Sequence, residues 1–513
     1  MLNTVKRGIQ LGKAGLAARR LNNASDEKQK EIARKALANL FANSRGVMMK
    51  VGQLLADSAD SPYRKLLDNI EPFPLEEILP CLEESLGRPA SEIFQSIDEA
   101  SSAASLGQVH KAVLLSGETV AVKIQYPDIG DAVDAELRLA GLLPGVGPVK
   151  KWGFDLEGYK KELKANMARE LNYLSEMERQ KAFCENVQVE GLVVPKVYPE
   201  LCSRTVLVQE WQNGLHINDI ESWPSEQRQE VARTLIKTLF TSLFVNGEIH
   251  GDPHIGNSYY RKTPTGKTEV VLMDYGCTVP IEKNARMALL KLIVSLREDT
   301  PVSPLECFSA MGFDASKLSY IDNALPMLSN ILLRPFLVEG RFKTSDWRLQ
   351  GDLDSLLGEK RWWFRSAGPA NLFMLIRAFQ GLVQNLESIK AFSSWSELLY
   401  EALGPQLIEQ ARNLNLPTLT PDLLSHSYSS DSLAKEFKVA VWENNSKTVG
   451  VTMPAAAVLE LKDIIPEDTL NLLQNSEEIN LDSILERVIQ SGIAPQTLFD
   501  YVHETKRYKV WLE

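Results

Sequence analysis

Two acidic side chains and one carboxamide stand where phosphoryl-transfer chemistry needs them. The run His250-Gly-Asp-Pro-His-Ile-Gly-Asn257 contains Asp252 and Asn257, and Asp274-Tyr275-Gly276 follows it along the chain. Phosphoryl transfer from a nucleotide needs one carboxylate that orients or deprotonates the attacking hydroxyl or water, and an amide and a second carboxylate that hold Mg²⁺ against the phosphates. We therefore predict Asp252 as the base or water-positioning residue and Asn257 and Asp274 as metal ligands. The predicted cofactors are ATP or ADP with Mg²⁺.

A lysine upstream of this loop completes the set. Val120-Ala-Val-Lys123 ends a β-rich run, and a lysine there reaches the nucleotide α- and β-phosphates when a glutamate from a nearby helix holds it. Glu170 and Glu176 lie in a stretch that we expect to be one helix, residues 155 to 186, where their spacing separates them by about 120°. We predict that Glu176 pairs with Lys123 and that both belong to the catalytic set.

The segment before the lysine strand should cover the phosphates. A glycine-rich loop would be usual there, because its backbone N–H groups approach phosphates in conformations that Ala and Ser avoid. This chain instead has Ser101-Ser-Ala-Ala-Ser-Leu-Gly-Gln-Val109, which we expect to be stiffer. We also expect the segment Glu210 to Asn213 to contact the adenine base, through its backbone more than its side chains. The residues predicted to contact nucleotide are Ala103, Ala104, Ser105, Gly107, Lys123, Glu210 and Gln212.

His250 and His254 bracket Asp252 and suggest two chemistries. Their imidazoles would suit a zinc or phosphodiesterase site. In loops of this kind imidazoles more often hydrogen-bond the backbone and hold the shape of the loop. We expect the second role.

Three motifs together resemble one protein family. Ser102-Ala-Ala-Ser-Leu-Gly-Gln-Val-His110 resembles the alanine-rich loop of the AarF/UbiB family, atypical protein-kinase-like proteins linked to ubiquinone (coenzyme Q) biosynthesis. Lys50-Val-Gly-Gln53 resembles the K-x-G-Q signature that the family carries in an N-terminal helical extension. The HGDPHIGN and DYG runs resemble its metal-binding loops. The resemblance covers about residues 40 to 400.

The resemblance implies a kinase-like fold in which the N-terminal extension folds over the place where a protein substrate would dock. Lys50 and Gln53 would then project toward the nucleotide and gate the site. It also implies ATP hydrolysis and support of a lipid pathway more than protein phosphorylation, with isoprenoid lipid or quinone intermediates, a biosynthetic complex or a homodimer as partners. One departure is that the family's E-x-D pattern appears here as Glu170-Leu-Asn172, where an amide supplies no negative charge.

Composition narrows the class of protein. The chain has 513 residues, 44% hydrophobic and 24% charged, which is ordinary for folded globular domains. The net charge of -11 argues against nucleic-acid binding. Five scattered cysteines indicate neither a disulfide framework nor a zinc site, so a cytoplasmic, reducing setting is expected. We expect no membrane span, but the basic residues within 1–21 suit peripheral contact with the inner face of a membrane.

The order of the predicted elements indicates an α+β, two-lobe fold with a small α+β C-terminal module. Residues 27 to about 100 are expected to be helical. Strands are expected at Val109 to Leu115, Thr119 to Gln125, Arg204 to Glu210, Tyr259 to Arg261, Glu269 to Met273, Phe437 to Trp442, Thr448 to Met453 and Tyr508 to Leu512. Further helices are expected at 225–246, across 283–415 and around Leu481 to Ile489. The predicted parts are a basic segment 1–40, a helical extension 41–100, an N-lobe 101–212, a C-lobe 213–430 and a C-terminal domain 431–513.

Two other functions fit parts of the sequence. A small-molecule phosphotransferase, of the kind that acts on aminoglycosides or choline, also carries an H-G-D-x-x-x-x-N loop, although K-V-G-Q and the alanine-serine loop argue against it. A non-catalytic nucleotide sensor that binds lipid and organises a complex is the other alternative. The basic and aromatic run Lys360-Arg-Trp-Trp-Phe-Arg365 suits a lipid-contacting surface, but such a cluster is more often half core and half surface.

Overall fold

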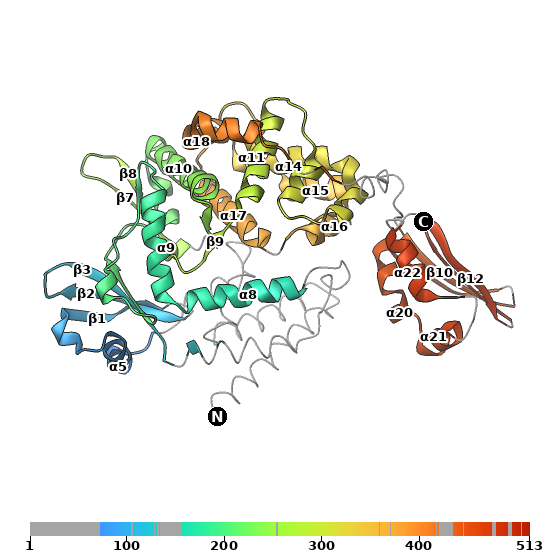
Figure 1. Cartoon of the computed structure of the whole chain (residues 1–513), viewed down its shortest axis with the longest axis horizontal. Coiled ribbons are helices and arrows are strands. Elements are labelled where there is room, and N and C mark those ends of the chain that lie inside the picture. The colour runs from blue at the N-terminus through green and yellow to red at the C-terminus, as the bar shows by residue number, and fades with distance from the viewer. Residues whose placement is uncertain are drawn as a thin grey trace. The chain divides into compact units, whose positions relative to one another are not determined.

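The structure is a computed structural model that divides into two compact units. The first unit contains residues 1–144, 157–281 and 373–393, and the second contains 145–156, 282–372 and 394–513. Figure 1 labels their helices and strands. The residues that the structure describes are 72–103, 106–127, 129–130, 133, 156–252, 255–358, 360–369, 371–416, 418–419, 434, 436–444, 446–474, 479–490, 495–503 and 505–513. Lys50, Gln53, Ala104, Ser105 and His254 lie outside this set.

The first unit contains a four-stranded antiparallel sheet with the strand order β1-β2-β3-β5. The bounds are α5 Leu75–Leu86, η1 Ala90–Glu92, β1 Phe94–Ala103, β2 Gly107–Leu114, β3 Thr119–Gln125 and β5 Val206–Glu210. The predicted hairpin at β2 and β3 is confirmed. Gly117 has φ 99°, and its N–H donates to the Leu114 carbonyl at 2.9 Å, as a tight turn requires.

Burial of apolar side chains fixes α5 on this sheet. Ile78 and Leu82 of α5 are fully buried in one core with Val120, Val122 and Val208 of the sheet. The helix ends where Gly87 adopts φ 68°, a left-handed conformation that glycine takes without a steric cost. The helix and the sheet therefore form two layers around a single hydrophobic core.

The expected helical stretch up to residue 100 is wrong from Phe94 onward. Residues Phe94–Ala103 form β1, which pairs with β2 from Phe94 opposite Leu114 to Ala103 opposite Gln108. Only Phe94 of β1 is buried, so this edge strand has no hydrophobic alternation to reveal it. Backbone pairing with β2 stabilises it instead.

The single helix expected over residues 155 to 186 is two helices. They are α8 Leu156–Glu170 and α9 Tyr173–Asn186. Asn172 separates them as the N-cap of α9, with its side-chain oxygen accepting from the Ser175 N–H at 3.4 Å. Glu170 and Glu176 therefore belong to different helices, and the 120° relation expected between them does not apply.

The rest of the first unit positions two polar loops. Its elements are β4 Leu192–Val193, η2 Pro199–Leu201, η3 Ile217–Ser222, α10 Ser225–Phe240, the π-helical turn η4 Thr241–Asn246, β6 Glu248–His250, η5 Ile255–Asn257, β7 Ser258–Lys262, β8 Thr268–Leu272, β9 Thr278–Pro280 and α17 Leu372–Ser388. The strands form a β4-β8-β7 sheet and a β6-β9 pair. The predicted helix at 225–246 and strands at 259–261 and 269–273 are confirmed within one or two residues.

The second unit begins with a helical body. Its helices are α11 Lys283–Arg297, α12 Pro304–Ala310, α13 Ala315–Leu318, η6 Ser319–Ala324, α14 Leu325–Leu337, η7 Thr344–Asp346, α15 Leu349–Leu357, α16 Lys360–Ala367 and α18 Trp395–Arg412. In α16, the Trp363 indole N–H donates to the Lys317 carbonyl at 2.6 Å, and Phe364 stacks on Phe313 at 5.2 Å. These two aromatic side chains of the basic and aromatic run therefore pack within the helical body.

The C-terminal residues of the second unit form an antiparallel sheet, β11-β10-β13-β12, with a core of its own. Its elements are β10 Glu436–Glu443, β11 Ser446–Pro454, η9 Ala455–Glu460, α20 Leu461–Ile464, α21 Glu467–Gln474, α22 Leu481–Gln490, β12 Gln496–His503 and β13 Lys506–Leu512. Phe437 and Val510 of the sheet pack with Val488 of α22. The hairpin, helix and final strand were predicted, whereas β12 was missed.

The mixed helices and sheets confirm the α+β prediction. Among the described residues, no helix combines the length and the apolar content needed to cross a bilayer.

Candidate functional site

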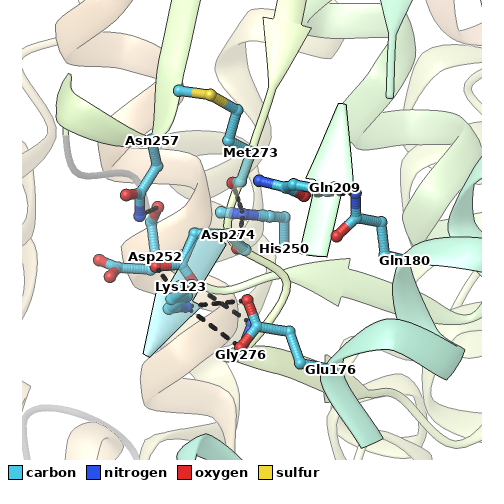
Figure 2. A network of polar contacts seen from close by, with 10 residues as sticks. All are labelled: Lys123, Glu176, Gln180, Gln209, His250, Asp252, Asn257, Met273, Asp274 and Gly276. Carbon is cyan, nitrogen blue, oxygen red and sulfur yellow. Dashed lines mark hydrogen bonds and ion pairs between the residues drawn. The ribbon is translucent and has the colours of Figure 1, made fainter. Parts of the chain in front are cut away.

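Lys123 and Glu176 form a buried ion pair. Lys123 lies on β3, flanked by Val109 of β2 and Leu207 of β5. Its ammonium nitrogen lies 2.9 Å from Oε1 and 3.1 Å from Oε2 of Glu176, which projects from the first turn of α9 (Figure 2). The Glu176 side chain is 1% exposed and the Lys123 side chain 14%. The predicted contact is therefore confirmed.

Asp274 joins this pair from the loop after β8. Its Oδ2 lies 3.3 Å from Lys123 Nζ, and its carboxylate is 35% exposed, far more than that of Glu176. Its backbone has φ 61°, a left-handed conformation that is uncommon outside glycine. The Gly276 N–H donates to Asp274 Oδ1 at 3.2 Å and helps to hold this conformation. The carboxylate is thus aimed at Lys123 while keeping a surface for a ligand.

Burial and charge act in opposite directions on the two buried groups. Burial lowers the pKa of Lys123, but the Asp274 and Glu176 carboxylates outweigh it and raise that pKa well above its ordinary value. Burial raises the pKa of Glu176 to about 7, and the nearby Lys123 ammonium limits the rise. Lys123 is therefore cationic throughout the physiological range.

The predicted cluster extends to the loop after β6. Asn257 Nδ2 donates to the Asp252 carbonyl at 3.3 Å, and the Met273 N–H donates to the Asn257 carbonyl at 2.8 Å. These bonds join the loop of Asp252 to the strand that ends before Asp274. Figure 2 shows Asp252, Asn257 and Asp274 gathered beside Lys123. Residues distant along the sequence therefore meet in one place.

His250 holds the same two segments together. Its Nε2 donates to the carbonyl of Asp274 at 2.7 Å and approaches that of Met273 at 3.2 Å. The expectation that an imidazole fixes the backbone of the loop is confirmed for His250. Across the described parts of the chain, no group of three or more His, Cys, Asp and Glu side chains is placed to hold a metal ion by itself.

Gly107 allows the strand next to the predicted phosphate loop to approach its neighbours closely. A β-carbon at Gly107 would collide with the Ile124 carbonyl oxygen and lie 2.9 Å from the Tyr173 hydroxyl. The Tyr173 ring in turn lies 4.9 Å from Lys123 Nζ. A side chain at position 107 would therefore push on a residue that packs directly against Lys123.

Gln108 and His110, for which no role was predicted, anchor the base of this loop. Both side chains are fully buried. The Gln108 amide accepts from the Phe73 N–H at 2.8 Å and donates to the Phe73 carbonyl at 2.9 Å. The Gln108 amide also lies 2.9 Å from His110 Nε2, and His110 Nδ1 lies 2.9 Å from the Asp98 carbonyl. The only sequence signal for this role was the presence of two polar residues at the start of a β-rich run.

The other predicted nucleotide contacts occupy two places. Ala103 ends β1 opposite Gln108, and Gly107 begins β2. Glu210 ends β5, where its N–H donates to the Lys196 carbonyl at 2.7 Å. The Gln212 side chain is buried and accepts from Arg261 Nη1 at 2.7 Å. That amide is engaged within the protein, and contact of this segment with the base remains a prediction.

Arg377 is a charged neighbour of the site that no sequence motif indicates. It lies on α17, and its Nη2 is 3.6 Å from Asp252 Oδ1. The helix α17 is amphipathic, and its sequence predicts only that its apolar face packs in the core. No local pattern distinguishes Arg377 from a surface arginine. Its proximity to Asp252 depends on tertiary folding.

Comparison with known proteins identifies the domain. Residues 65–300 match the ABC1 atypical kinase-like domain. An ABC1 family protein of Schizosaccharomyces pombe is 28% identical over 57% of this chain and 57% of its own. AarF domain-containing protein kinase 1 of Gallus gallus is 33% identical over 51% of this chain and 52% of its own. The chain thus spans about half the length of these curated relatives.

A solved structure agrees over a longer span. The Mycobacterium tuberculosis protein Rv3197, in its complex with erythromycin, is 26% identical, has a TM-score of 0.51 and covers 74% of this chain and 98% of its own. The matched range, residues 65–300, contains the β3 lysine, the α9 glutamate and both polar loops. Residues 65–300 of this chain therefore match the ABC1 atypical kinase-like domain, and the similar curated proteins include AarF domain-containing kinases.

Proposed function

We propose that this domain binds MgATP and transfers the terminal phosphoryl group to water or to a small or lipid-like acceptor. The observation that carries the proposal is the double contact of Lys123 with Glu176 and Asp274, at 2.9 and 3.3 Å. A lysine held in this way beside a metal-binding carboxylate is the arrangement that phosphoryl transfer from a nucleotide requires.

Each predicted residue has a role in this proposal. Lys123 holds the α- and β-phosphates, and Glu176 orients Lys123. Asp252 receives the proton of the acceptor or positions the attacking water. The phosphate cover is assigned to Ala103, Ala104, Ser105 and Gly107, contact with the base to Glu210 and Gln212, and gating of the site to Lys50 and Gln53.

The residues present fit a magnesium ion. The Asp274 carboxylate is partly exposed and lies beside the phosphate-binding lysine. The Asn257 amide nitrogen donates to the backbone, which leaves the amide oxygen as the atom suited to a cation. Mg²⁺ takes oxygen ligands and commonly uses one or two protein groups with substrate phosphates. When bound, the ion would neutralise phosphate charge, and Asn257 and Asp274 would hold it.

We further propose that the acceptor belongs to isoprenoid-lipid metabolism, of which ubiquinone synthesis is one example. This assignment is supported by the alanine-rich loop and K-x-G-Q resemblance. The basic residues within 1–21 would bring the protein to the surface of a membrane. Comparing quinone intermediates in cells with and without the protein tests the acceptor class, and unchanged intermediates would contradict it.

Nucleotide binding and turnover, measured on the same samples, test the catalytic proposal. Purified wild-type protein should bind MgATP and release phosphate slowly. The Asp252→Asn variant should keep MgATP binding and lose about 100-fold in turnover, since it lacks the proton acceptor. Binding without turnover in the wild type, together with full cellular complementation by Asp252→Asn, would favour the non-catalytic nucleotide sensor instead.

A further inference from the structure

Arg377 places a cation on the Asp252 side of the site. Its guanidinium Nη2 lies 3.6 Å from Asp252 Oδ1, and the two side chains are 12% and 14% exposed. At this separation the two charges attract each other, but the contact is longer than a hydrogen bond. Asp252 therefore neutralises Arg377 without occupying the guanidinium in the bidentate geometry that carboxylates often adopt.

The guanidinium has donor capacity that the protein does not use. Its Nη1 is buried, and no hydrogen-bond acceptor reaches it among the described residues. A buried donor of this kind is costly unless a partner forms a bond with it. Arginine stays charged at all relevant pH values and offers a planar fork of N–H groups that matches phosphate oxygens. Both properties point to an anionic ligand at this position.

Because Lys123 is already paired with carboxylates, a second cation is needed to stabilise the negative charge of the phosphates. Lys123 contacts two carboxylates, those of Glu176 and Asp274. Its charge is therefore largely matched before any nucleotide binds. In phosphoryl transfer, negative charge spreads over the oxygens of the transferring group, and an arginine supplied by the same chain is one way in which enzymes stabilise it. Arg377 is a cation that lies close to the proposed base.

We propose that Arg377 binds the terminal phosphate of ATP and is a catalytic residue of this domain. This inference rests on the proposed function. In the step, the acceptor oxygen bonds to the γ-phosphorus, the bond from that phosphorus to the β,γ-bridging oxygen breaks, and ADP leaves with the electron pair. The acceptor proton passes to Asp252. Protonated Asp252 attracts Arg377 less, which favours the contact between the guanidinium and the phosphoryl oxygens.

Binding of a diphosphate and of a triphosphate analogue separates this role from a structural one. For Arg377→Gln, we expect MgAMP-PNP affinity to fall about tenfold while MgADP affinity changes by less than about twofold, because only the former has a terminal phosphate at this position. ATP turnover should fall about 100-fold. Arg377→Lys should restore part of the AMP-PNP affinity, because a point charge replaces the planar fork. Isothermal titration calorimetry measures both affinities.

Two controls make the test specific. Gln380→Ala changes an exposed residue of the same helix and should leave both affinities as in the wild type. In an Asp252→Asn background, Arg377→Gln should still weaken MgAMP-PNP binding, because the lost contact is with the nucleotide. If the residue served only to pair with Asp252, the second substitution would have no further effect there.

The outcomes that overturn the inference differ from those that overturn the proposed function. Equal loss of MgADP and MgAMP-PNP binding in Arg377→Gln, or no loss of either, would show that Arg377 does not contact the terminal phosphate. Faster ATP turnover in that variant would show that Arg377 restrains Asp252 and would also overturn the inference. A wild-type protein that binds neither nucleotide would reject the proposed function, and this inference with it.

Discussion

Lys123 Nζ lies 2.9 Å from Glu176 Oε1, and this contact joins the four-stranded sheet β1-β2-β3-β5 to the first turn of α9. Both side chains are largely buried, so each charge depends on the other for its stability. The contact also directs the ammonium toward Asp274, which lies 3.3 Å away. One ion pair thereby links the fold of the domain to the geometry of its proposed site.

Removing the carboxylate at position 176 tests this dependence. Glu176→Gln leaves Lys123 with Asp274 as its charged partner, and we expect the free energy of unfolding to fall by about 2 kcal/mol. We also expect MgADP affinity to fall about tenfold, because Lys123 is no longer held toward the phosphates. Urea denaturation and titration calorimetry measure the two effects. Glu178→Gln alters an exposed glutamate of α9 and should change neither the unfolding free energy nor the MgADP affinity. Equal effects of the two substitutions would contradict the account.

The pKa of Glu176 predicts how nucleotide binding depends on pH. Burial raises this pKa to about 7, so the carboxyl gains a proton as the pH falls through that value and loses its charge beside Lys123. MgADP affinity should therefore rise between about pH 6 and pH 8. The folded-state pKa lies above the unfolded one, so this group favours the folded state most at low pH, and that contribution is lost as the pH rises toward about 7.

Glu176→Gln is the control for this pH dependence, since its side chain does not titrate. Titrations at several pH values should show a smaller change in MgADP affinity for the variant than for the wild type. The nucleotide itself titrates in both samples, so the difference between the two curves isolates Glu176. Parallel curves would mean that Glu176 stays ionised throughout and would contradict the prediction.

Close packing at Gly107 predicts an unfavourable effect of a single methyl group. Gly107→Ala would collide with the Ile124 carbonyl and press on Tyr173, so we expect a loss of about 2 kcal/mol in unfolding free energy. Gly351→Ala in α15 is the control, since no atom lies within 4 Å of the added β-carbon there. Alanine suits a helix interior better than glycine and should leave Gly351→Ala as stable as the wild type or slightly more so. Wild-type stability of Gly107→Ala would argue against the close approach.

The cap at Asn172 explains how this chain tolerates an amide where the family pattern has a carboxylate. Asn172→Ala should cost about 1 kcal/mol in unfolding free energy, because the Ser175 N–H loses its acceptor. Asn172→Asp should retain wild-type stability, since a carboxylate also caps helices and suits a helix N-terminus. Chemical denaturation of the three proteins decides. A destabilised Asn172→Asp variant would show that the amide has a role beyond capping.

The sequence allowed prediction of the parts whose signals are local. The β2–β3 hairpin has β-rich runs on both sides of Ser116-Gly117-Glu118, and the structure has strands there. The pairing of Lys123 with Glu176 was predicted because a strand lysine needs a glutamate from a nearby helix, and α9 supplies it. In that case the chemistry of phosphate binding limited the possible partners of Lys123 to a glutamate on a nearby helix.

Features that depend on tertiary contacts were missed. The strand β1 is an edge strand whose side chains are mostly exposed, so its sequence shows no regular alternation of apolar and polar residues. The break between α8 and α9 falls at Asn172, which suits a helix interior poorly but does not by itself end a helix. Arg377 approaches Asp252 from a helix with no motif of its own. The division of the chain into five parts remains a prediction.

If Lys123, Asp252, Asn257 and Asp274 form one site for Mg²⁺ and nucleotide, the Asp274→Asn variant should lose nucleotide binding. A thermal-shift titration with MgADP and MgATP compares this variant with the wild type, because a ligand that binds the folded state raises its melting temperature. We expect a concentration-dependent rise in melting temperature for the wild type and none for Asp274→Asn. Undiminished stabilisation of the variant by either nucleotide would contradict this expectation.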